Sequence, residues 1–429
     1  MVLKSLSRGR PYVTNAATPA DGLLAVINGA AIAKSYLAGR HGIAAPSETI
    51  ARVNGLAEVI GITRVANVTG LDRLGIPVVS VCRPNARSLA LSQGKGLDLD
   101  AAMASGLMES AEIWHAENVE HRLRFDDFAG LARTERVVDV AGLPRLKDSR
   151  YSEHLRMLWI EGEDLVSGTR LWLPYETVRA DFVVPQPPGS GCFDASTNGL
   201  ASGLHALEAI IHGTCEVIER DAISLMFHRP TAEWRRRRVI AESIAEPSAA
   251  ALLQLIASAG LDIAVWDITT DLAIPAFYVL LLDRRDETSH LGIGSGCHLS
   301  PAVALTRAIT EAAQVRTTYL SGAREDLGDD DYDLAFLAQR ARWALGVAGG
   351  GAGALDFAGI RDLSASTLNE DFETLKRSLM EAGVEQIVAV DLSRRDFPIA
   401  VVKMVIPGVE GPHDHAAYQP GPRAQQLRR

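Results

Sequence analysis

The segment that decides the fold runs from Thr197 to Ala222 and reads TNGLASGLHALEAIIHGTCEVIERDA. Gly199 and Gly203 permit tight backbone geometry, so its first residues predict a small-residue turn. From Ala206 onward, apolar and acidic residues alternate at helical spacing. The segment therefore predicts a turn that leads into a helix.

The acidic residues of this predicted helix share one broad face. At about 100° per residue, Glu219 lies about 20° from Glu208 around the helix, and Glu216 about 80° from it. A solvated helix face usually pairs each glutamate with a basic residue three or four positions away, and only Arg220 is at hand. An ordinary solvated face nevertheless stays an alternative at this point.

Clustered carboxylates need neutralisation by protons or cations. Two of them about 4 Å apart repel by roughly 4 kcal/mol at an effective dielectric constant of 20. Mg²⁺ prefers a few carboxylates together with water and phosphate oxygens over a cage built only of protein. This helix therefore predicts a magnesium and phosphate site.

A second predicted helix, from Asp100 to about His121, also carries a polar face. It contains Ser105, Glu109 and Glu112, and the two glutamates are three residues apart on one side. Such a pair alone is weak evidence, because many surface helices have one.

A third predicted helix, from Pro301 to about Leu320, repeats the pattern. Around its axis, Glu311 lies about 40° to one side of Arg307 and Gln314 about 20° to the other. The alternative is a surface ion pair worth a few tenths of a kcal/mol. Three such helices in one chain favour a shared site.

Composition narrows the class of protein. The chain has 429 residues, of which 47% are hydrophobic, enough for one large domain or two ordinary ones. A formal net charge of -10 argues against binding to nucleic acid or to an anionic membrane surface. The basic run Arg235 to Arg238 is the exception, with two interpretations. It either binds a partner or an acidic peptide, or is a solvated helix end or loop.

The four cysteines and the N-terminus indicate the compartment. Cys82, Cys192, Cys215 and Cys297 are far apart and show no zinc-binding spacing, so we expect reduced thiols. The N-terminus lacks the residue order of a signal peptide, and no apolar run approaches about 20 residues. We expect a cytoplasmic protein with no membrane span.

The remaining patterns predict alternating helices and strands. No P-loop and no Rossmann fingerprint is present. We expect helices at 46–58, 329–345 and 368–382, and a helix or irregular lead-in at 22–39. The expected strands are 62–68, 77–83, 155–161, 171–174, 263–268, 276–283, 291–298, 386–391 and 399–406. We also expect a flexible loop at 92–96, a glycine-rich loop at 346–353 and an extended tail at 407–429.

Over most of its length the chain resembles the YcaO superfamily. The resemblance rests on three segments in order. The first is G-K-G followed by S-x3-E-x2-E at Ser105, Glu109 and Glu112, and the second is N-G-L-A-S-G followed by E-x7-E-x2-E-R at Glu208, Glu216, Glu219 and Arg220. The third is R-x3-E-x2-Q at Arg307, Glu311 and Gln314, followed by S-G-A-R-E-D.

This resemblance implies an α/β (α+β) fold: a single large domain of mixed, mainly antiparallel sheets with packed helices. This domain would occupy residues 22–412, between a flexible arm at 1–21 and a proline-containing tail at 413–429.

The resemblance also implies that carboxylates and basic residues hold ATP and Mg²⁺ without a P-loop. The metal ligands implied are Glu109, Glu112, Glu208, Glu216, Glu219 and Glu311, and the ATP contacts implied are Arg52, Ser105, Arg220 and Arg307. Lys95 is a further candidate for a phosphate contact, with a solvent-facing turn lysine as the equal alternative. No general base can be named.

Family members use ATP to phosphorylate a peptide carbonyl oxygen as a nucleophile adds to the carbon. A Cys, Ser or Thr side chain of a precursor peptide then yields an azoline, and an external sulfide equivalent yields a thioamide. Azoline-forming members commonly end in P-x-P-x-P, whereas this chain has only P-x-P at Pro420 and Pro422. Residues 34–85 look more like stand-alone members that work with a TfuA-type partner in thioamidation.

We therefore expect an ATP-dependent thioamide synthetase acting on a ribosomal peptide or protein, with an azoline-forming cyclodehydratase as runner-up. A homodimer is implied by family analogy. Departures from the family occur at Gly39 to Gly42, which read G-R-H-G where many relatives have G-T-H-R, at Leu204 where an Asn is common, and at Ile113 where some relatives have Arg. Arg40 is a candidate replacement for the basic residue missing at 42. The departures at residues 39–42 and at Leu204 motivate a second hypothesis, a nucleotide-binding scaffold without catalysis. A third hypothesis is an acidic metabolic enzyme that shares only the fold.

Overall fold

A computed structural model describes residues 22–286, 289–349 and 353–427. The expected flexible arm at 1–21 and part of the glycine-rich loop lie outside them. The helices are α1 (Leu23–Ile27), α2 (Pro46–Asn54), α3 (Ala57–Ile60), α4 (Leu99–Glu117), α5 (Phe128–Leu131), α6 (Ala206–Phe227), α7 (Thr231–Arg236), α8 (Pro247–Ser258), α9 (Pro301–Ser321), α10 (Leu334–Ala348), α11 (Leu368–Glu381) and α12 (Pro422–Gln426). The strands are β1 (Arg64–Asn67), β2 (Val78–Cys82), β3 (Leu91–Lys95), β4 (Leu123–Asp126), β5 (Met157–Asp164), β6 (Arg170–Pro174), β7 (Leu200–Gly203), β8 (Asp262–Asp267), β9 (Ala276–Leu282), β10 (Gly292–Cys297), β11 (Val388–Asp391) and β12 (Ala400–Val405).

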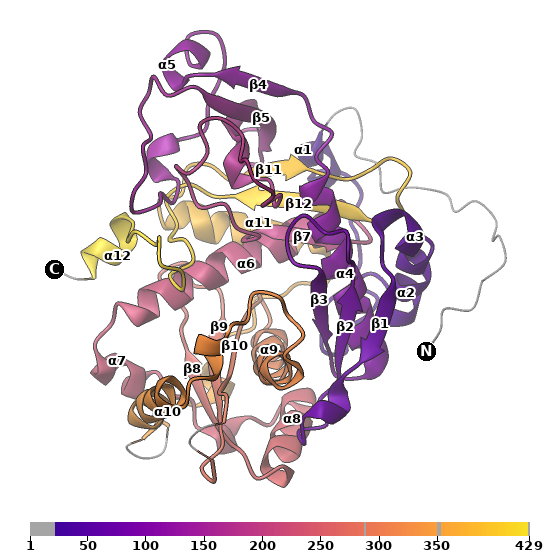
Figure 1. Ribbon diagram of the computed structural model, residues 1–429, viewed down its shortest axis with the longest axis vertical. Helices are drawn as coiled ribbons and strands as arrows, with labels where there is room; N and C mark the ends of the chain where they lie inside the picture. Colours follow the sequence, from indigo (N-terminus) through magenta and orange to yellow (C-terminus); the bar gives the residue numbers. More distant parts are fainter. Residues whose placement is uncertain (1–21, 287–288, 350–352, 428–429) are drawn as a thin grey trace.

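The described strands form three sheets, and every pair of neighbouring strands is antiparallel (Figure 1). Two sheets have three strands, in the orders β1-β2-β3 and β10-β9-β8. The third has the order β4-β5-β11-β12-β7, with β6 beside β5. Isolated parallel bridges join Val137 to Trp172 and Val239 to Leu355. The expected α/β fold with mixed, mainly antiparallel sheets is confirmed.

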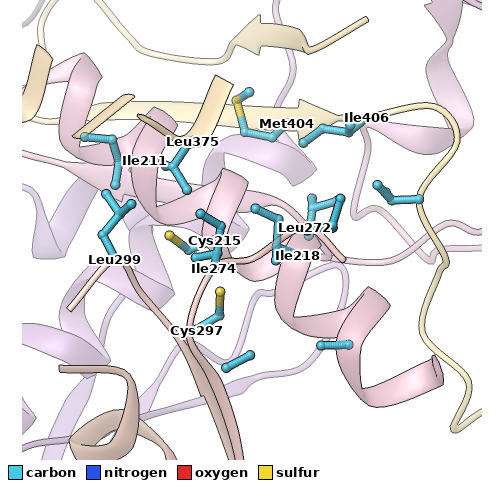
Figure 2. Close-up of a cluster of buried hydrophobic side chains, with 14 of the residues drawn as sticks. Ile211, Cys215, Ile218, Leu272, Ile274, Cys297, Leu299, Leu375, Met404 and Ile406 are labelled. Atoms are coloured by element: carbon cyan, nitrogen blue, oxygen red, sulfur yellow. The ribbon is translucent and has the colours of Figure 1, made fainter. Parts of the chain in front are cut away.

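Helix α6 is the central element, crossing the middle of the molecule between the large sheet and the β8 to β10 sheet (Figure 1). One face of it is apolar, and Ile211, Cys215 and Ile218 on that face belong to one buried cluster. Figure 2 shows these side chains among neighbours from other elements: Leu272, Ile274, Cys297, Leu299, Leu375, Met404 and Ile406. Burial of this face fixes the direction in which the acidic face points.

The large sheet separates two cores because side chains alternate along each strand. Val402 and Met404 of β12 pack in the cluster with α6, whereas Val401 and Val405 pack in the cluster with α4. The sheet therefore brings α4 and α6 near one another from opposite faces.

Glycines bring two strands into backbone contact with the helices that follow them. A Cβ atom on Gly94 of β3 would lie 2.0 Å from the carbonyl oxygen of Ala102 in α4. A Cβ atom on Gly294 of β10 would lie 2.0 Å from the carbonyl oxygen of Ala308 in α9. The prediction of a flexible loop at 92–96 is therefore wrong, because its glycines allow close approach of a strand to a helix.

Two other predictions also need correction. Residues 200–203, expected as a turn before α6, form β7, whose Ala201 pairs with Val402 of β12. The tail expected to be extended contains α12. Arg423 there donates from Nε to Asp221 of α6 at 2.8 Å, which ties the end of the chain back to the central helix.

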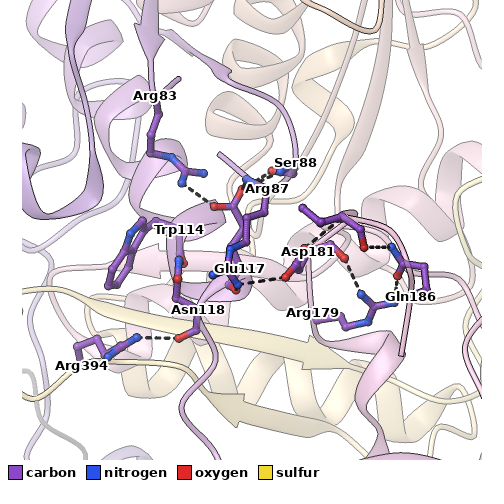
Figure 3. Close-up of polar contacts among 11 residues, drawn as sticks. Arg83, Arg87, Ser88, Trp114, Glu117, Asn118, Arg179, Asp181, Gln186 and Arg394 are labelled. Atoms are coloured by element: carbon purple, nitrogen blue, oxygen red, sulfur yellow. Dashed lines mark hydrogen bonds and ion pairs between the residues drawn. The ribbon is translucent and has the colours of Figure 1, made fainter. Parts of the chain in front are cut away.

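The C-terminal end of α4 is fixed by a buried glutamate (Figure 3). Glu117 accepts a hydrogen bond at 2.5 Å from Nη1 of Arg83, and both side chains are almost fully buried. The backbone N–H groups of Arg87 and Ser88 donate to the other carboxylate oxygen at 2.9 and 3.0 Å. This network orients α4, which carries part of the acidic site.

None of the described helices is both long and apolar enough to cross a lipid bilayer.

Candidate active site

Carboxylates from α4, α6 and α9 converge in one region. Glu216 of α6 is near enough to Glu109 and Glu112 of α4 to raise the pKa of both. Arg220, one turn further along α6, interacts with Glu311 of α9. The three predicted polar helix faces therefore meet.

The two carboxylates of α4 hold protons more tightly than free glutamates do. Burial, with added repulsion from Glu109 and Glu216, raises the pKa of Glu112 to about 8. Burial also raises the pKa of Glu109 to about 7, although Lys95 acts in the opposite direction. Glu112 is held in place by Ser202, whose N–H and hydroxyl donate to Oε1 at 2.9 and 2.6 Å.

Glu208 lies at the start of α6 and links it to the N-terminal region. Its two oxygens accept from the backbone N–H groups of Ile43 and Leu204, each at 2.8 Å. The guanidinium of Arg40 lies 3.8 Å from Glu208 Oε1. A Cβ atom on Gly42 would lie 2.7 Å from Arg40 Nη2. Gly42 therefore leaves the space that Arg40 fills beside Glu208.

Further along α6, two glutamates share one arginine. Arg220 Nη2 lies 4.0 Å from Glu216 and 3.8 Å from Glu219. Ser295 of β10 donates to Glu219 Oε1 at 2.7 Å. Burial raises the pKa of Glu216 to about 7 against the pull of Arg220, and Glu219 adds to the rise.

Basic side chains line the α9 side of the site. Lys95 Nζ donates to Glu311 Oε2 at 2.9 Å. Burial opposes ionisation of Glu311, but Lys95 and Arg220 together hold its pKa below the usual value. Arg307 contacts the imidazole of His212, whose pKa is held well below its usual value by burial and by Arg307 itself. Lys95 is therefore turned into the site, unlike a solvent-facing lysine.

Two predicted ATP contacts are less closely tied to the cluster. Arg52 donates from Nη2 to Glu48 at 2.6 Å on the same helix, α2. Within the described parts of the chain, no hydrogen bond or ion pair joins Arg52 to the glutamates of α4, α6 or α9. Ser105 lies one turn before Glu109 on α4, half-buried.

The charge distribution fits a divalent cation that keeps part of its coordination for phosphate and water. The described residues contain no group of three or more His, Cys, Asp or Glu side chains arranged to hold a metal ion by themselves. Three half-buried carboxylates with raised pKa values nevertheless face one another across α4 and α6. Such a donor set suits Mg²⁺, which takes one or two carboxylates together with phosphate oxygens.

A cavity of about 560 Å³ adjoins this cluster. Arg220, Glu311 and Ser295 form part of its wall, together with aromatic side chains from α6, β9 and α9. Sequence reasoning missed the C-terminal residues Pro412, His413 and Asp414 that line it, because nothing in their spacing links them to the three helices. It named Arg324 only inside the S-G-A-R-E-D segment, and Arg324 lines the cavity and lowers the pKa of Glu109.

Residues 93–410, which include all three acidic helices, match the sequence profile of a family described as YcaO cyclodehydratases that bind ATP and Mg²⁺. The chain belongs to the YcaO family. The resemblance seen in the sequence is thereby confirmed. ATP and Mg²⁺, the expected cofactors, are those that the family description names.

Relatives at the sequence level share about a third of their residues with this YcaO chain. An uncharacterized protein in the tfuA 3' region of Rhizobium leguminosarum bv. trifolii is 33% identical over 373 residues, which cover 85% of this chain and 87% of that protein. An uncharacterized protein of Methanothermobacter thermautotrophicus is 34% identical over 383 residues, which cover 85% and 94% of the two chains.

Solved structures share the fold. The YcaO protein of Methanopyrus kandleri, bound with AMPPCP and Mg²⁺, has a TM-score of 0.69 at 20% identity and matches 88% of this chain and 95% of its own. A heterocyclase in complex with substrate and cofactor has a TM-score of 0.74 at 22% identity and matches 89% of this chain. This chain spans only 54% of the heterocyclase.

Proposed function

We propose that this YcaO protein uses Mg²⁺ and ATP to activate a peptide backbone amide, and that its product is a thioamide. The observation that carries the proposal is the convergence of half-buried carboxylates with raised pKa values from α4 and α6 beside Arg220. Ribosomal peptide or protein modification is the context we propose. Residues 22–412 would form the catalytic domain, with the proline-containing tail at 413–429 attached.

The roles follow from position and charge. The metal ligands we propose are Glu109, Glu112, Glu208, Glu216, Glu219 and Glu311. Arg220, Arg307 and Lys95 lie among them and would contact phosphate oxygens, and Ser105 and Arg52 would complete the nucleotide site. When bound, Mg²⁺ neutralises the phosphate charge and ATP supplies the phosphoryl group. The fixed carboxylates and arginines then supply positioning and electrostatic stabilisation, from which such catalysis draws most of its acceleration.

The thioamide product is preferred because the chain has only P-x-P near its end and because residues 34–85 resemble TfuA-associated members. The Rhizobium relative lies in a tfuA 3' region, which supports a TfuA-type partner. We also propose a homodimer, which light scattering after gel filtration would detect.

The test is a mass measurement on peptides. The purified protein would be incubated with ATP, Mg²⁺, sodium hydrosulfide and a library of short random peptides, with and without a TfuA-type protein. We expect peptides that carry the mass change of oxygen-to-sulfur exchange, together with release of ADP and phosphate. Loss of water from peptides containing Cys, Ser or Thr would instead establish the cyclodehydratase.

A non-catalytic scaffold is separated by nucleotide titration. The double variant Glu208→Gln, Glu219→Gln keeps the shape of both side chains and removes two charges. We expect it to lose affinity for Mg²⁺ and ATP. Unchanged affinity would favour a scaffold that does not use the acidic residues.

A further inference from the structure

The segment after β12 brings a histidine to the cavity beside the acidic cluster. His413 and Asp414 lie in the wall of the 560 Å³ cavity, which Arg220 and Glu311 also line. His413 therefore faces the same space as two residues of the proposed ATP site. Because the wall also contains Phe227, Tyr278 and Tyr319, part of this space is apolar.

The chain on both sides of His413 is anchored. Glu410 accepts from the backbone N–H groups of Gly421 and Ala424 at 2.6 and 3.0 Å, so residues 410–424 form a closed loop. Asp221 of α6 accepts from the backbone N–H of Glu410 at 2.7 Å and from Arg423 at 2.8 Å. The side chain of His413 is thus held at a fixed place over the second half of α6.

The ring of His413 is fixed by stacking on an aromatic side chain. It stacks on Phe227 with 4.4 Å between ring centroids and 29° between the planes. Among the residues that the structure describes, no hydrogen bond engages either of its ring nitrogens. By contrast, His212 contacts Arg307, and the ring nitrogen of His298 accepts from the N–H of Ser300 at 2.9 Å. An imidazole that is oriented but not used for structure is suited to proton transfer.

The surroundings keep this imidazole neutral at pH 7. Burial lowers its pKa from the usual 6.5, and Asp414 acts in the opposite direction. Arg220 of α6, His228 just after its end and His415 of the same segment as His413 lower this pKa further. A neutral imidazole has a lone pair ready to accept a proton.

We propose that His413 is the general base of the reaction and accepts the proton of the nucleophile in this cavity. This inference rests on the proposed thioamide synthesis.

In that reaction hydrosulfide forms a C–S bond to the amide carbon, and the carbonyl π electrons move to the oxygen. That oxygen takes the γ-phosphoryl group as the bond from phosphorus to ADP breaks. A ring nitrogen of His413 then removes the S–H proton, the S–H electron pair becomes the C=S bond, and the C–O bond breaks to release phosphate. The proton passes from His413 to phosphate or solvent, so amide, hydrosulfide and ATP give thioamide, ADP and phosphate.

The test compares three variants of the full-length chain in the peptide assay described above. His413→Phe keeps a flat ring for stacking on Phe227, and His413→Gln keeps polarity. His415→Gln is the matched control, because His415 lies two residues away and pairs with Asp194 at 3.5 Å outside the cavity wall. A lost general base typically costs about 10²-fold or more in rate. We expect that loss in kcat/KM for both His413 variants, with affinity for ATP and Mg²⁺ within about twofold of wild type, and no loss for His415→Gln.

Two further measurements separate a proton-accepting His413 from a merely structural one. The acid limb of the wild-type rate profile should lie below pH 6.5 and vanish in His413→Gln. In protein without substrate, diethylpyrocarbonate should modify His413 at pH 7, as measured by mass spectrometry with the exposed His154 as reference. If His413 stays unmodified while His154 reacts, or if the His413 variants keep more than about a third of the rate, the inference is overturned. A wild-type protein that modifies no peptide would instead refute the proposed function, whatever the reactivity of His413.

Discussion

Substitution of Glu216 by Gln should stabilise the metal-free protein at alkaline pH while removing its nucleotide affinity. Glu216 interacts with Glu109, Glu112 and Glu219, and its pKa in the folded protein is about 7 instead of about 4.5. That difference corresponds to about 3 kcal/mol, since each pKa unit is worth about 1.4 kcal/mol. Glutamine has nearly the same shape and cannot ionise, so the gain at pH 8 should be about 2 to 3 kcal/mol.

The direction of the pH dependence follows from proton linkage. Between about pH 4.5 and 7 the unfolded chain has released the proton of Glu216 and the folded protein still holds it. The folded state therefore binds more protons, and its stability falls as the pH rises through this range. At pH 5 Glu216 is still protonated in the folded protein, so Glu216→Gln and the wild type should be nearly equally stable.

Urea unfolding at pH 5 and pH 8 in the presence of EDTA measures both effects. The control is Glu135→Gln, which changes the charge equally at a side chain that is 41% exposed and should have little effect. A Glu216→Gln variant that is less stable than wild type at pH 8, or equally more stable at both pH values, would refute the reasoning. Titration with ATP and Mg²⁺ should in parallel show lost affinity for Glu216→Gln alone.

Three other substitutions test the supports of the site. Glu117→Gln removes the charge that neutralises buried Arg83, and should cost about 3 kcal/mol or more in urea unfolding; a cost below about 1 kcal/mol would contradict the buried pair. Gly294→Ala places a methyl group against a carbonyl oxygen of α9, and should lower the melting temperature measurably, whereas an unchanged value would contradict the close contact. Ser202→Ala removes a hydroxyl donor from Glu112 and should weaken Mg²⁺ binding about 10-fold in calorimetry; unchanged binding would contradict a role of this hydroxyl in orienting Glu112 for the metal.

The sequence indicated the helices of the site because their signal is local. Glutamates at helical spacing mark one face of α4 and of α6, and Arg307, Glu311 and Gln314 mark one face of α9. The predicted helices match the observed ones to within a few residues at most ends. α6 is the exception, since it continues to Phe227 beyond the expected Ala222. Ile223, Leu225 and Met226 there are buried apolar residues, so this last turn adds nothing to the acidic pattern.

Features that depend on tertiary contact were not predictable from spacing. Gly94 resembles a loop residue in the sequence, and only its contact with α4 shows why it lies in a strand. Arg40 fills the space above Gly42, which needs the three-dimensional path of both residues. His413 reaches the cavity because residues 410–424 close into an anchored loop, and the ring on which it stacks, Phe227, is far away in sequence.

The most direct test of the central claim is a crystal structure with Mn²⁺ in place of Mg²⁺ and a non-hydrolysable ATP analogue, in which anomalous scattering locates the metal. We predict Mn²⁺ bound to carboxylate oxygens from at least two of the three helices α4, α6 and α9, with analogue phosphate oxygens completing its coordination. Metal and nucleotide bound elsewhere, with the glutamates of α4 and α6 bound to protein groups alone, would contradict it.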